Sequence, residues 1–197
     1  MTADQATIDY YQDKAPEYVK AFDHGHSRHL DAFLDRLEPG AEILELGCGG
    51  GRDTIRMIER GFAVDPTDGT PAMAKEAEKH IGQAVRVMRF DEISAANAYD
   101  AVWAHACLLH ARWDDVPSIL GAIRTALKPA GLHFANFKLG DGEGRDLLGR
   151  WGNFPSANDL EEVYSAAGFA ILASDIYRGK GADGTIRDWM AITVEAP

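Results

Sequence analysis

The sequence predicts a single α/β domain, residues 1–197, on a mostly parallel seven-stranded sheet with helices on both faces and an antiparallel last strand. Five apolar, strand-like runs alternate with helix-like segments between residues 42 and 137, which is typical of parallel strands joined by right-handed crossovers. A wide glycine-rich turn joins two further runs, at 169–174 and 188–194, and favours an antiparallel pair. The chain has 197 residues, 46% of them hydrophobic, enough for one core and too few to expect two domains.

The charge balance and the segment lengths restrict the partners. The formal net charge is −11, whereas a nucleic-acid surface carries an excess of lysine and arginine, so no nucleic-acid partner is expected. No stretch has the length of a membrane span, and the first residues lack the basic start and apolar core of a signal peptide. We therefore expect a cytoplasmic protein with no membrane partner.

Neither the cysteines nor the clustered histidines form a metal-binding pattern. Cys48 lies in a glycine-rich turn and Cys107 in an apolar run, and both are predicted to be small packing residues. His24, His26 and His29 lie close together, but no cysteine or carboxylate at ligand spacing completes a zinc site. The sequence predicts a solvated surface or a pocket rim here, and no metal.

Two helices are predicted ahead of the first strand. Apolar residues recur every three or four positions from 3 to 22, as in an amphipathic helix, with a bend expected before Pro16. A second helix is expected to start near Ser27, to run through Leu37 and to end before Gly40. The apolar face of the first helix must pack on another element.

A glycine-rich turn follows the first strand. Residues 42–46 alternate with period two, which puts Ile43 and Glu45 on one side of a strand. The chain then has four glycines within residues 47–51 and resumes helical spacing from Thr54. Glycine lets the backbone approach a ligand closely, and the N–H groups of a helix start favour an anionic or hydroxylic group. A ligand-binding turn is therefore predicted.

The remaining elements alternate as the fold class requires. Pro66 cannot donate to a sheet ladder, so the second strand is expected to end early or to bulge there. Thr70 and Pro71 predict a helix start, and residues 128–131 are expected to close a helix. Further strands are predicted at 61–68, 84–90, 100–105 and 132–137, and a further helix at 114–127.

The rhythm changes after Lys138. Residues 139–155 are rich in glycine and charge and are expected to form a long loop, which in a compact domain is usually functional or mobile. Ser156 is predicted to cap a helix that leads into the last two strands.

Two nucleotide classes fit a strand, a glycine turn and a helix: a dinucleotide and S-adenosylmethionine (SAM). A dinucleotide turn has the pattern Gly-x-Gly-x-x-Gly. Counting from Gly47 and Gly49, its third glycine position is Arg52; counting from Gly49 and Gly51, it is Thr54. The dinucleotide pattern therefore fails in both registers.

Residues 45–51 fit the pattern acid-x-Gly-x-Gly-x-Gly and resemble the class I SAM-dependent methyltransferases. The resemblance implies that Asp68, at the end of the second strand, binds the ribose diol, with Asp65 as a competing candidate. It further implies that Asp91 or Glu92, after the third strand, receives the adenine amine. Three segments are similar to a narrower branch, the bacterial small-molecule methyltransferases grouped with tellurite-resistance proteins: 99–110, 127–131 and 137–143.

This resemblance implies a Rossmann-like class I methyltransferase fold, SAM as the cofactor and S-adenosylhomocysteine as the product. Residues 1–38 would form a helical lid over the cofactor, and residues 139–155 a loop on the substrate side. The implied cofactor-binding residues are Tyr11, Glu45, Gly47, Gly49, Gly51, Asp53, Asp68, Gly69, Met73, Phe90, Asp91 and His105.

Methyl transfer by in-line displacement depends mainly on positioning and on exclusion of water. If the acceptor needs deprotonation, His110 is the candidate catalytic base; the alternative is a buried histidine bonded to backbone. Tyr18, Lys138 and Trp151 are predicted to bind substrate, although Lys138 could instead be solvated and Trp151 could anchor the loop to the core. Met73 could equally be an ordinary core residue, and Tyr18 a packing residue.

Three functions stay open at this point. The first is a methyltransferase with a small-molecule acceptor, as a monomer or weak homodimer. The second is a non-catalytic SAM-binding module. The third is a nicotinamide-dinucleotide oxidoreductase, which Arg52 and Thr54 disfavour.

Overall fold

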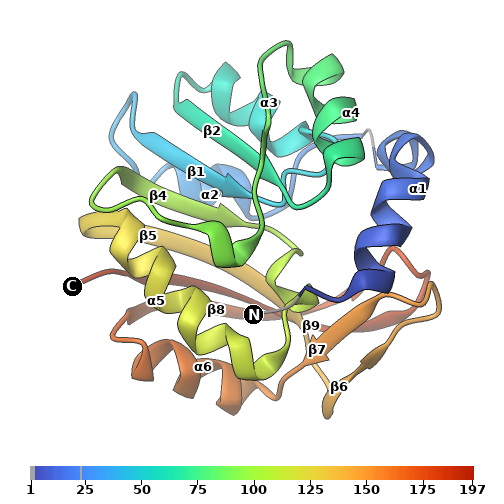
Figure 1. Ribbon diagram of the computed structural model, residues 1–197. Helices are drawn as coiled ribbons and strands as arrows, with labels where there is room; N and C mark the ends of the chain where they lie inside the picture. The colour runs from blue at the N-terminus through green and yellow to red at the C-terminus, as the bar shows by residue number, and fades with distance from the viewer. Residues whose placement is uncertain (1–2, 23) are drawn as a thin grey trace.

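The computed structural model describes residues 3–22 and 24–197. The strands of its main sheet are β1 (Glu42–Leu46), β2 (Ala63–Asp68), β3 (Arg86–Val87), β4 (Tyr99–Ala104), β5 (Leu127–Lys138), β8 (Ala170–Lys180) and β9 (Ile186–Glu195). They form a seven-stranded sheet in the order β3-β2-β1-β4-β5-β9-β8 (Figure 1). The strands pair in parallel except β9, which runs antiparallel to both β5 and β8. The predicted fold class is confirmed.

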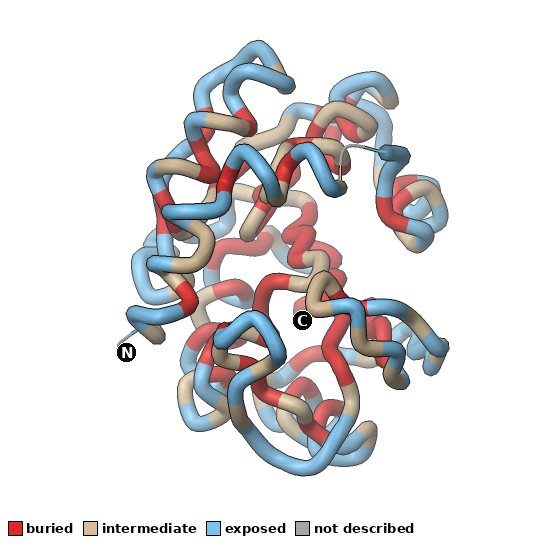
Figure 2. Tube along the Cα trace, turned by 90° about the vertical axis from the view of Figure 1, so that its right-hand side faces the viewer, coloured by how far each residue is buried: buried red, intermediate tan, exposed pale blue. Residues whose placement is uncertain are grey.

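Helices cover both faces of this sheet. In the described part of the chain they are α1 (Gln5–Ala21), α2 (Leu30–Leu34), α3 (Arg52–Glu59), α4 (Pro71–Ile81), α5 (Val116–Ala126) and α6 (Ala157–Ala166). Leu44 and Leu46 of β1 pack in the cluster that includes α5 and α6, whereas Ile43 packs in the cluster that includes α2 and α3. The alternation read from the sequence is confirmed, and Figure 2 shows the buried positions gathered in the middle of the molecule.

The second N-terminal helix is shorter than the spacing predicts. A helix is predicted from near Ser27 to Leu37, but α2 spans only Leu30–Leu34. The backbone N–H and the hydroxyl of Ser27 both donate to the carboxylate of Asp53, at 2.7 and 2.5 Å. Because its hydroxyl is held by α3, Ser27 does not cap a helix of its own.

Strands β2 and β3 also differ from expectation. Instead of ending at Pro66, β2 continues to Asp68, while β3 has two residues where 84–90 is predicted. The two residues of β3 pair with Thr67 and Asp68 only. Pro66 thus lies where β2 has no β3 neighbour, a position at which proline is tolerated.

Residues 139–155, predicted to be a loop, contain a β-hairpin. Its strands are β6 (Gly142–Arg145) and β7 (Trp151–Phe154), which pair antiparallel. Residues 128–131, predicted to end a helix, are instead the first part of β5. Propensity alone did not predict either segment, because their backbone hydrogen bonds depend on partner strands.

Helix α1 extends from the hairpin to α4 on one side of the sheet (Figure 1). Asp4 caps its start by accepting from the backbone N–H of Thr7 at 2.9 Å. The helix continues through Pro16 to Ala21. Among residues 3–22 and 24–197, none of the helices combines the length and the apolar character that a membrane-spanning helix needs.

Candidate functional site

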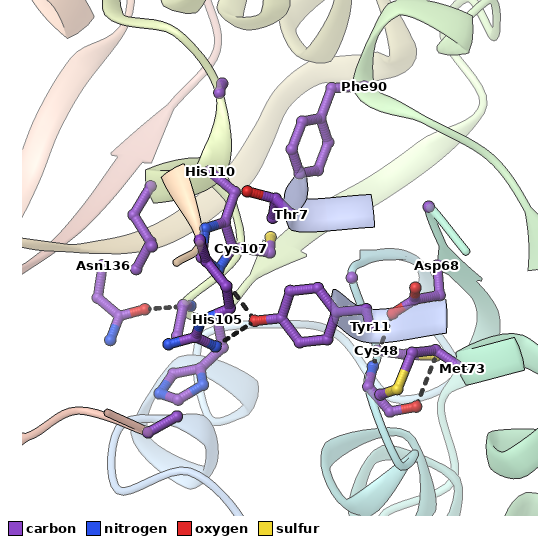
Figure 3. A pocket seen from close by; sticks show the side chains of 18 of the residues that line it. Thr7, Tyr11, Cys48, Asp68, Met73, Phe90, His105, Cys107, His110 and Asn136 are labelled. Atoms are coloured by element: carbon purple, nitrogen blue, oxygen red, sulfur yellow. Dashed lines mark hydrogen bonds between the residues drawn. The ribbon is translucent and has the colours of Figure 1, made fainter. Parts of the chain in front are cut away.

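A cavity of about 480 Å³ lies at the carboxyl ends of β1, β2, β4 and β5, beside α1. This is the edge at which parallel α/β sheets bind their ligands. In Figure 3 the ring of Tyr11 lies between two groups of lining residues. One group is Cys48, Asp68 and Met73; the other is His105, His110 and Asn136.

The glycine turn forms one wall, and two of its glycines are required there. Gly47 and Gly49 have φ angles of 64° and 59°, which side chains other than glycine rarely adopt. A Cβ on Gly47 would also lie 2.5 Å from the Cβ of Cys107. Gly51 also has a positive φ, 82°, but it lies outside the cavity as the N-cap of α3, and a Cβ there would collide with Ile81 of α4. The glycine at 51 thus serves helix packing.

Asp68 connects the glycine turn to the start of α4. One carboxylate oxygen accepts from the backbone N–H of Gly49 at 3.2 Å, and the other accepts from the N–H and the hydroxyl of Thr70, at 3.0 and 3.1 Å. Burial raises the pKa of Asp68 to about 6, while these hydrogen bonds oppose the shift. Gly69, also predicted to bind the cofactor, lines the cavity beside it.

The structure separates the competing acids by position. Asp65 accepts from Arg86 and Tyr99 at 2.6 and 2.5 Å, and it lies outside the cavity. After the third strand, Asp91 lines the cavity, whereas Glu92 accepts from the backbone N–H of Arg89 at 2.8 Å. Of these four acids, Asp68 and Asp91 are therefore the ones that line the cavity.

Glu45 and Asp53 hold the backbone around the turn. Glu45 is buried outside the cavity and accepts a short hydrogen bond from the hydroxyl of Thr54. Burial, with the charge of Asp53 nearby, raises the pKa of Glu45 to about 8. Asp53 borders the cavity, but its carboxylate is occupied by Ser27 and by the indole N–H of Trp103 at 3.0 Å. Direct contact of Glu45 with a cofactor does not fit its burial behind the turn.

Several apolar residues predicted at the cofactor line the cavity. Met73 is buried against Ala15 and Val19 of α1 while it also faces the cavity, so it is a core residue and a lining residue at once. Phe90 and His105 line it too. The imidazole of His105 stacks on Trp103 at 6.1 Å between ring centres, and burial lowers its pKa to about 4.

Tyr11, His110 and Arg150 form a hydrogen-bonded chain in the cavity wall. Nδ1 of His110 lies 2.6 Å from the carbonyl oxygen of Trp151 and Nε2 lies 3.0 Å from the hydroxyl of Tyr11. Because a carbonyl only accepts, Nδ1 carries the hydrogen and Nε2 accepts from Tyr11. The Tyr11 oxygen in turn accepts from Arg150 at 2.7 Å. Burial, helped by the Arg150 charge, lowers the pKa of His110 to about 4, so the ring is neutral.

The structure divides the predicted substrate residues. Tyr18 lines the cavity and meets Tyr11 edge to face at 5.2 Å between ring centres. Trp151 lies outside the cavity: its ring is flanked by Arg112, and its backbone N–H donates to Thr7 at 2.7 Å. The anchoring interpretation of Trp151 fits this position, because its contacts connect the hairpin to α1 and to Arg112.

Lys138, predicted to bind substrate with a solvated position as the alternative, is buried, and so is Arg150. Lys138 and Arg150 are each 2% exposed and line the cavity. Arg150 donates to the carboxylate of Asp146 through Nε and Nη2, at 3.0 and 2.6 Å. The sequence marked neither position as buried, since Lys138 immediately precedes the region rich in glycine and charge and Arg150 lies within it.

Asn136 is a lining residue that the sequence reasoning missed. Its side-chain oxygen accepts from the backbone N–H of Ala106 at 2.6 Å, and its amide donates to the hydroxyl of Tyr177 at 2.9 Å. Ala106 has a φ of 53°, rare for a residue other than glycine. A polar residue inside an apolar strand pattern was the available signal.

Both cysteines and the clustered histidines lie within the described residues, 3–22 and 24–197. Cys48 and Cys107 are free and buried, and burial raises the pKa of both thiols. Over these residues, no three histidine, cysteine or acidic side chains come together as metal ligands.

Comparison with known proteins gives consistent results. Residues 43–131 match the family model described as a methyltransferase domain. A ubiquinone biosynthesis O-methyltransferase of Xanthomonas axonopodis pv. citri is 35% identical over 113 residues, which are 53% of this chain and 46% of that protein. The chain thus spans about half the length of the curated relatives it matches.

Two solved structures extend the likeness over the whole chain. The 1,6-didemethyltoxoflavin-N1-methyltransferase of Burkholderia thailandensis, with bound 1,6-didemethyltoxoflavin and S-adenosylhomocysteine, has a TM-score of 0.77 and 21% identity; 98% of this chain and 88% of that one are covered. The magnesium protoporphyrin IX methyltransferase of Synechocystis PCC 6803 has a TM-score of 0.76 and 13% identity, with 98% and 100% covered. The fold is that of the class I SAM-dependent methyltransferases.

Both of these structures hold S-adenosylhomocysteine, and the cavity of this chain offers residues that would suit such a ligand. Gly47 and Gly49 leave a side-chain-free wall that any Cβ would narrow. Asp68 offers a buried carboxylate beside that wall, suited to a hydroxyl pair. Met73 and Phe90 supply an apolar lining for a base, and Asp91 an acceptor for an amine.

Proposed function

We propose that the protein is a SAM-dependent methyltransferase with a small-molecule acceptor. The observation that carries the proposal is the composition of one cavity. Asp68 and the glycine turn line one part of the cavity, where we place the cofactor. Lys138 and Trp189 line the other part. Its volume of about 480 Å³ is in the range of small-molecule sites.

At the cofactor end, we assign to Asp68 the two ribose hydroxyls and to Asp91 the adenine amine. Met73 and Phe90 would flank the base. When bound, the cofactor supplies a methyl group on a sulfonium, which a nucleophile can take in one in-line displacement. The chain therefore needs no covalent nucleophile, and Cys48 and Cys107, whose thiol pKa values are raised by burial, have no such role.

The main work of the chain is positioning the reactants and excluding water. Tyr11 and Tyr18 of α1 line the cavity, and α1 is bonded to the hairpin through Thr7 and Tyr11. Holding two reactants in a reactive geometry can supply roughly 7 to 11 kcal/mol. A covered cavity also keeps solvent from competing for the methyl group.

His110 is assigned a positioning role. Both ring nitrogens are bonded, Nε2 to Tyr11 and Nδ1 to Trp151, so the ring connects α1 to the hairpin. A general base needs a free lone pair within reach of the proton it takes. The predicted catalytic role therefore requires Tyr11 to withdraw first.

The relatives support a small acceptor by their names. One acts as an O-methyltransferase in ubiquinone biosynthesis, and another was solved with 1,6-didemethyltoxoflavin. The net charge of −11 fits poorly with a nucleic-acid substrate. The predictions of a cytoplasmic location, a monomer or weak homodimer, and kinship with tellurite-resistance proteins stay predictions.

Calorimetry with SAM, S-adenosylhomocysteine and NAD tests the proposal. We expect both SAM and S-adenosylhomocysteine to bind and NAD to show no measurable binding. A screen of small oxygen, nitrogen and sulfur nucleophiles for release of S-adenosylhomocysteine then tests turnover. Binding without turnover for any acceptor would favour a SAM-binding module, and preferential binding of NAD would contradict the proposal.

A further inference from the structure

Lys138 is a buried cation in the part of the cavity away from Asp68, because β1 and β4 lie between β2, which Asp68 ends, and β5. Lys138 ends β5, where its side chain is 3% exposed, and it lines the cavity. A lysine this deeply buried normally requires a close partner, because removing an ammonium from water is costly. Its surroundings therefore indicate what the site is built to hold.

The contacts of Lys138 leave its hydrogens unused. Nζ lies 3.8 Å from Oδ1 of Asp183 and 5.6 Å from the ring centre of Trp189, and neither contact is a hydrogen bond. Asp183 is itself held by the backbone N–H of Thr185 at 3.3 Å. Asp183 thus compensates the charge of Lys138, but the ammonium keeps its donors for a ligand.

Gly181 packs against the ammonium and its counter-ion. It lines the cavity, and a Cβ at this position would collide with Oδ1 of Asp183 and lie 3.0 Å from Nζ of Lys138. A side chain here would displace both members of this ion pair. Glycine therefore allows the turn between β8 and β9 to lie against Lys138 without disturbing it.

The charged groups around Lys138 favour an anionic ligand. The groups that interact electrostatically with Lys138 are Arg150, Arg187, Asp146 and Asp183. With Lys138, these are three cations and two carboxylates, a surplus of one positive charge. Arg150 is not available to a ligand, because Asp146 and Tyr11 occupy its guanidinium. Lys138 keeps its donors free, and because the cations Arg28 and Lys180 also line the cavity, the site favours an anion.

The walls next to Lys138 suit an organic body. Trp189 and Tyr177 both line the cavity, with their rings stacked 6.4 Å apart at 14° between planes. We propose that the methyl acceptor is an organic acid whose carboxylate is bound by Lys138. That the bound acid is the methyl acceptor rests on the proposed function. The carboxylate site itself rests only on the residues around Lys138.

Matched neutral and anionic probes test this site. Benzoate and benzamide, and butyrate and butyramide, would be titrated calorimetrically into the protein alone and into the protein saturated with S-adenosylhomocysteine. We expect each acid to bind on the order of tenfold or more tightly than its amide, since a charge-assisted hydrogen bond is lost in the amide. In Lys138→Met, which keeps chain length without charge, the preference should disappear.

Lys75→Met is the matched control, because Lys75 is exposed on α4 and should keep the preference for acids. Gly181→Ala is the second variant: it retains every charge but its Cβ would displace both Nζ of Lys138 and the carboxylate of Asp183, and we expect it to weaken binding of the acids and not of the amides. This variant decides the question even if Lys138→Met does not fold.

Other outcomes would overturn the carboxylate site. These are equal binding of acid and amide by the unmodified protein, an unchanged preference in both Lys138→Met and Gly181→Ala, or tighter binding of inorganic phosphate than of benzoate. A preference for acids without any binding of S-adenosylhomocysteine would leave this site standing and contradict the proposed function. Binding of S-adenosylhomocysteine with no preference for acids would agree with the proposed function and contradict the carboxylate site.

Discussion

Asp68 experiences two opposing influences at the scale of a single residue. Burial favours its neutral form and raises its pKa to about 6, whereas hydrogen bonds from Gly49 and Thr70 favour the carboxylate. A raised pKa means that the apoprotein loses stability as the pH rises through about 6 and the buried group ionises. The ionised form is also the better acceptor for two hydroxyl groups. Asp68 in its ionised form therefore costs stability, and in the proposed function it would gain two hydroxyl donors from the cofactor.

Replacing Asp68 should weaken the cofactor complex specifically. We expect Asp68→Ala to cost about 1.5 to 3 kcal/mol of SAM binding, because a charged hydrogen-bond partner is lost. Asp65→Ala is the matched control, since Asp65 lies on the same strand but faces Arg86 and Tyr99 outside the cavity. Calorimetry would measure both variants. Equal losses in the two would contradict the assignment of Asp68.

The pH dependence of binding provides a second prediction. S-adenosylhomocysteine has no group that titrates between pH 5 and 7, whereas Asp68 has a pKa of about 6. We expect the affinity to fall roughly tenfold between pH 7 and pH 5 as the carboxylate is protonated. The same titration with Asp68→Asn should be flat over this range. A wild-type profile without a change near pH 6 would mean that Asp68 is not the group that binds the diol.

His110 can be tested as a positioning residue against the base hypothesis. We expect His110→Ala to raise the KM for SAM and to leave kcat within about tenfold, whereas loss of a general base costs about 10² to 10⁴ in kcat. Tyr11→Phe removes only the hydroxyl that His110 accepts from, so it should give the same pattern. Steady-state kinetics with any active acceptor measures both variants. A kcat loss of the larger size in His110→Ala alone would restore the base hypothesis.

At the scale of elements, α1 connects two parts of the structure that border the cavity. Near its start, Asp4 pairs with Arg145 of β6 at 3.0 and 2.9 Å, and Thr7 accepts from Trp151 of β7. Farther along, Gln12 accepts from the N–H of Ala72 in α4 at 3.2 Å. The helix must move away from one of these partners to uncover the cavity.

Loosening the hairpin end of α1 should increase its opening. We expect Arg145→Ala to speed amide exchange across the first half of α1 by up to about fivefold, because an exposed ion pair contributes about 0.2 to 1 kcal/mol. Lys14→Ala is the control: Lys14 lies on the same helix and pairs with Glu17 at 3.9 Å within it. Hydrogen exchange with mass spectrometry measures the effect. Equal acceleration in α6 would indicate general destabilisation.

At the scale of the whole molecule, the cavity joins elements from nearly the full length of the chain. Its lining runs from residues near the start of α1 to Trp189 in β9. A ligand that contacts these elements stabilises the folded state and not the unfolded chain, so it should add to the stability by mass action.

Cofactor binding should therefore raise the melting temperature. At a free concentration of S-adenosylhomocysteine about 100 times Kd, the added stability is about 2.7 kcal/mol, which corresponds to about 5 to 10 °C for a domain of this size. Differential scanning fluorimetry measures the shift. Asp68→Ala at the same concentration should shift less. A shift of equal size with NAD would argue against a cofactor site specific for SAM.

Much of the fold followed from local patterns. The alternation in β1, the capping position of Thr70 and the cap at Ser156 were all readable, because each depends on neighbours within a few residues. The glycine turn and the acids after β2 and β3 were readable for the same reason. These patterns predicted Gly47, Gly49, Asp68 and Asp91 as site residues without reference to distant contacts, and all four line the cavity.

Other features depended on contacts between distant segments. Gly51 and Glu45 share the turn motif, yet only the packing of Ile81 and of Thr54 reveals that they lie outside the cavity. The sequence could not show that β6 and β7 pair. Nor could it show that Trp151 lies outside the cavity. The length of β3 likewise depended on its partner strand.

The sequence by itself determined the class of fold and which glycines and acids line one part of the cavity, since strand period, glycine conformations and helix starts are local properties of the chain. Only the tertiary structure decided the other part. Lys138 and Arg150 became buried cations because α1, the hairpin and the turn between β8 and β9 close around them. Burial is a property of all the segments that meet at a point, and no local pattern records it.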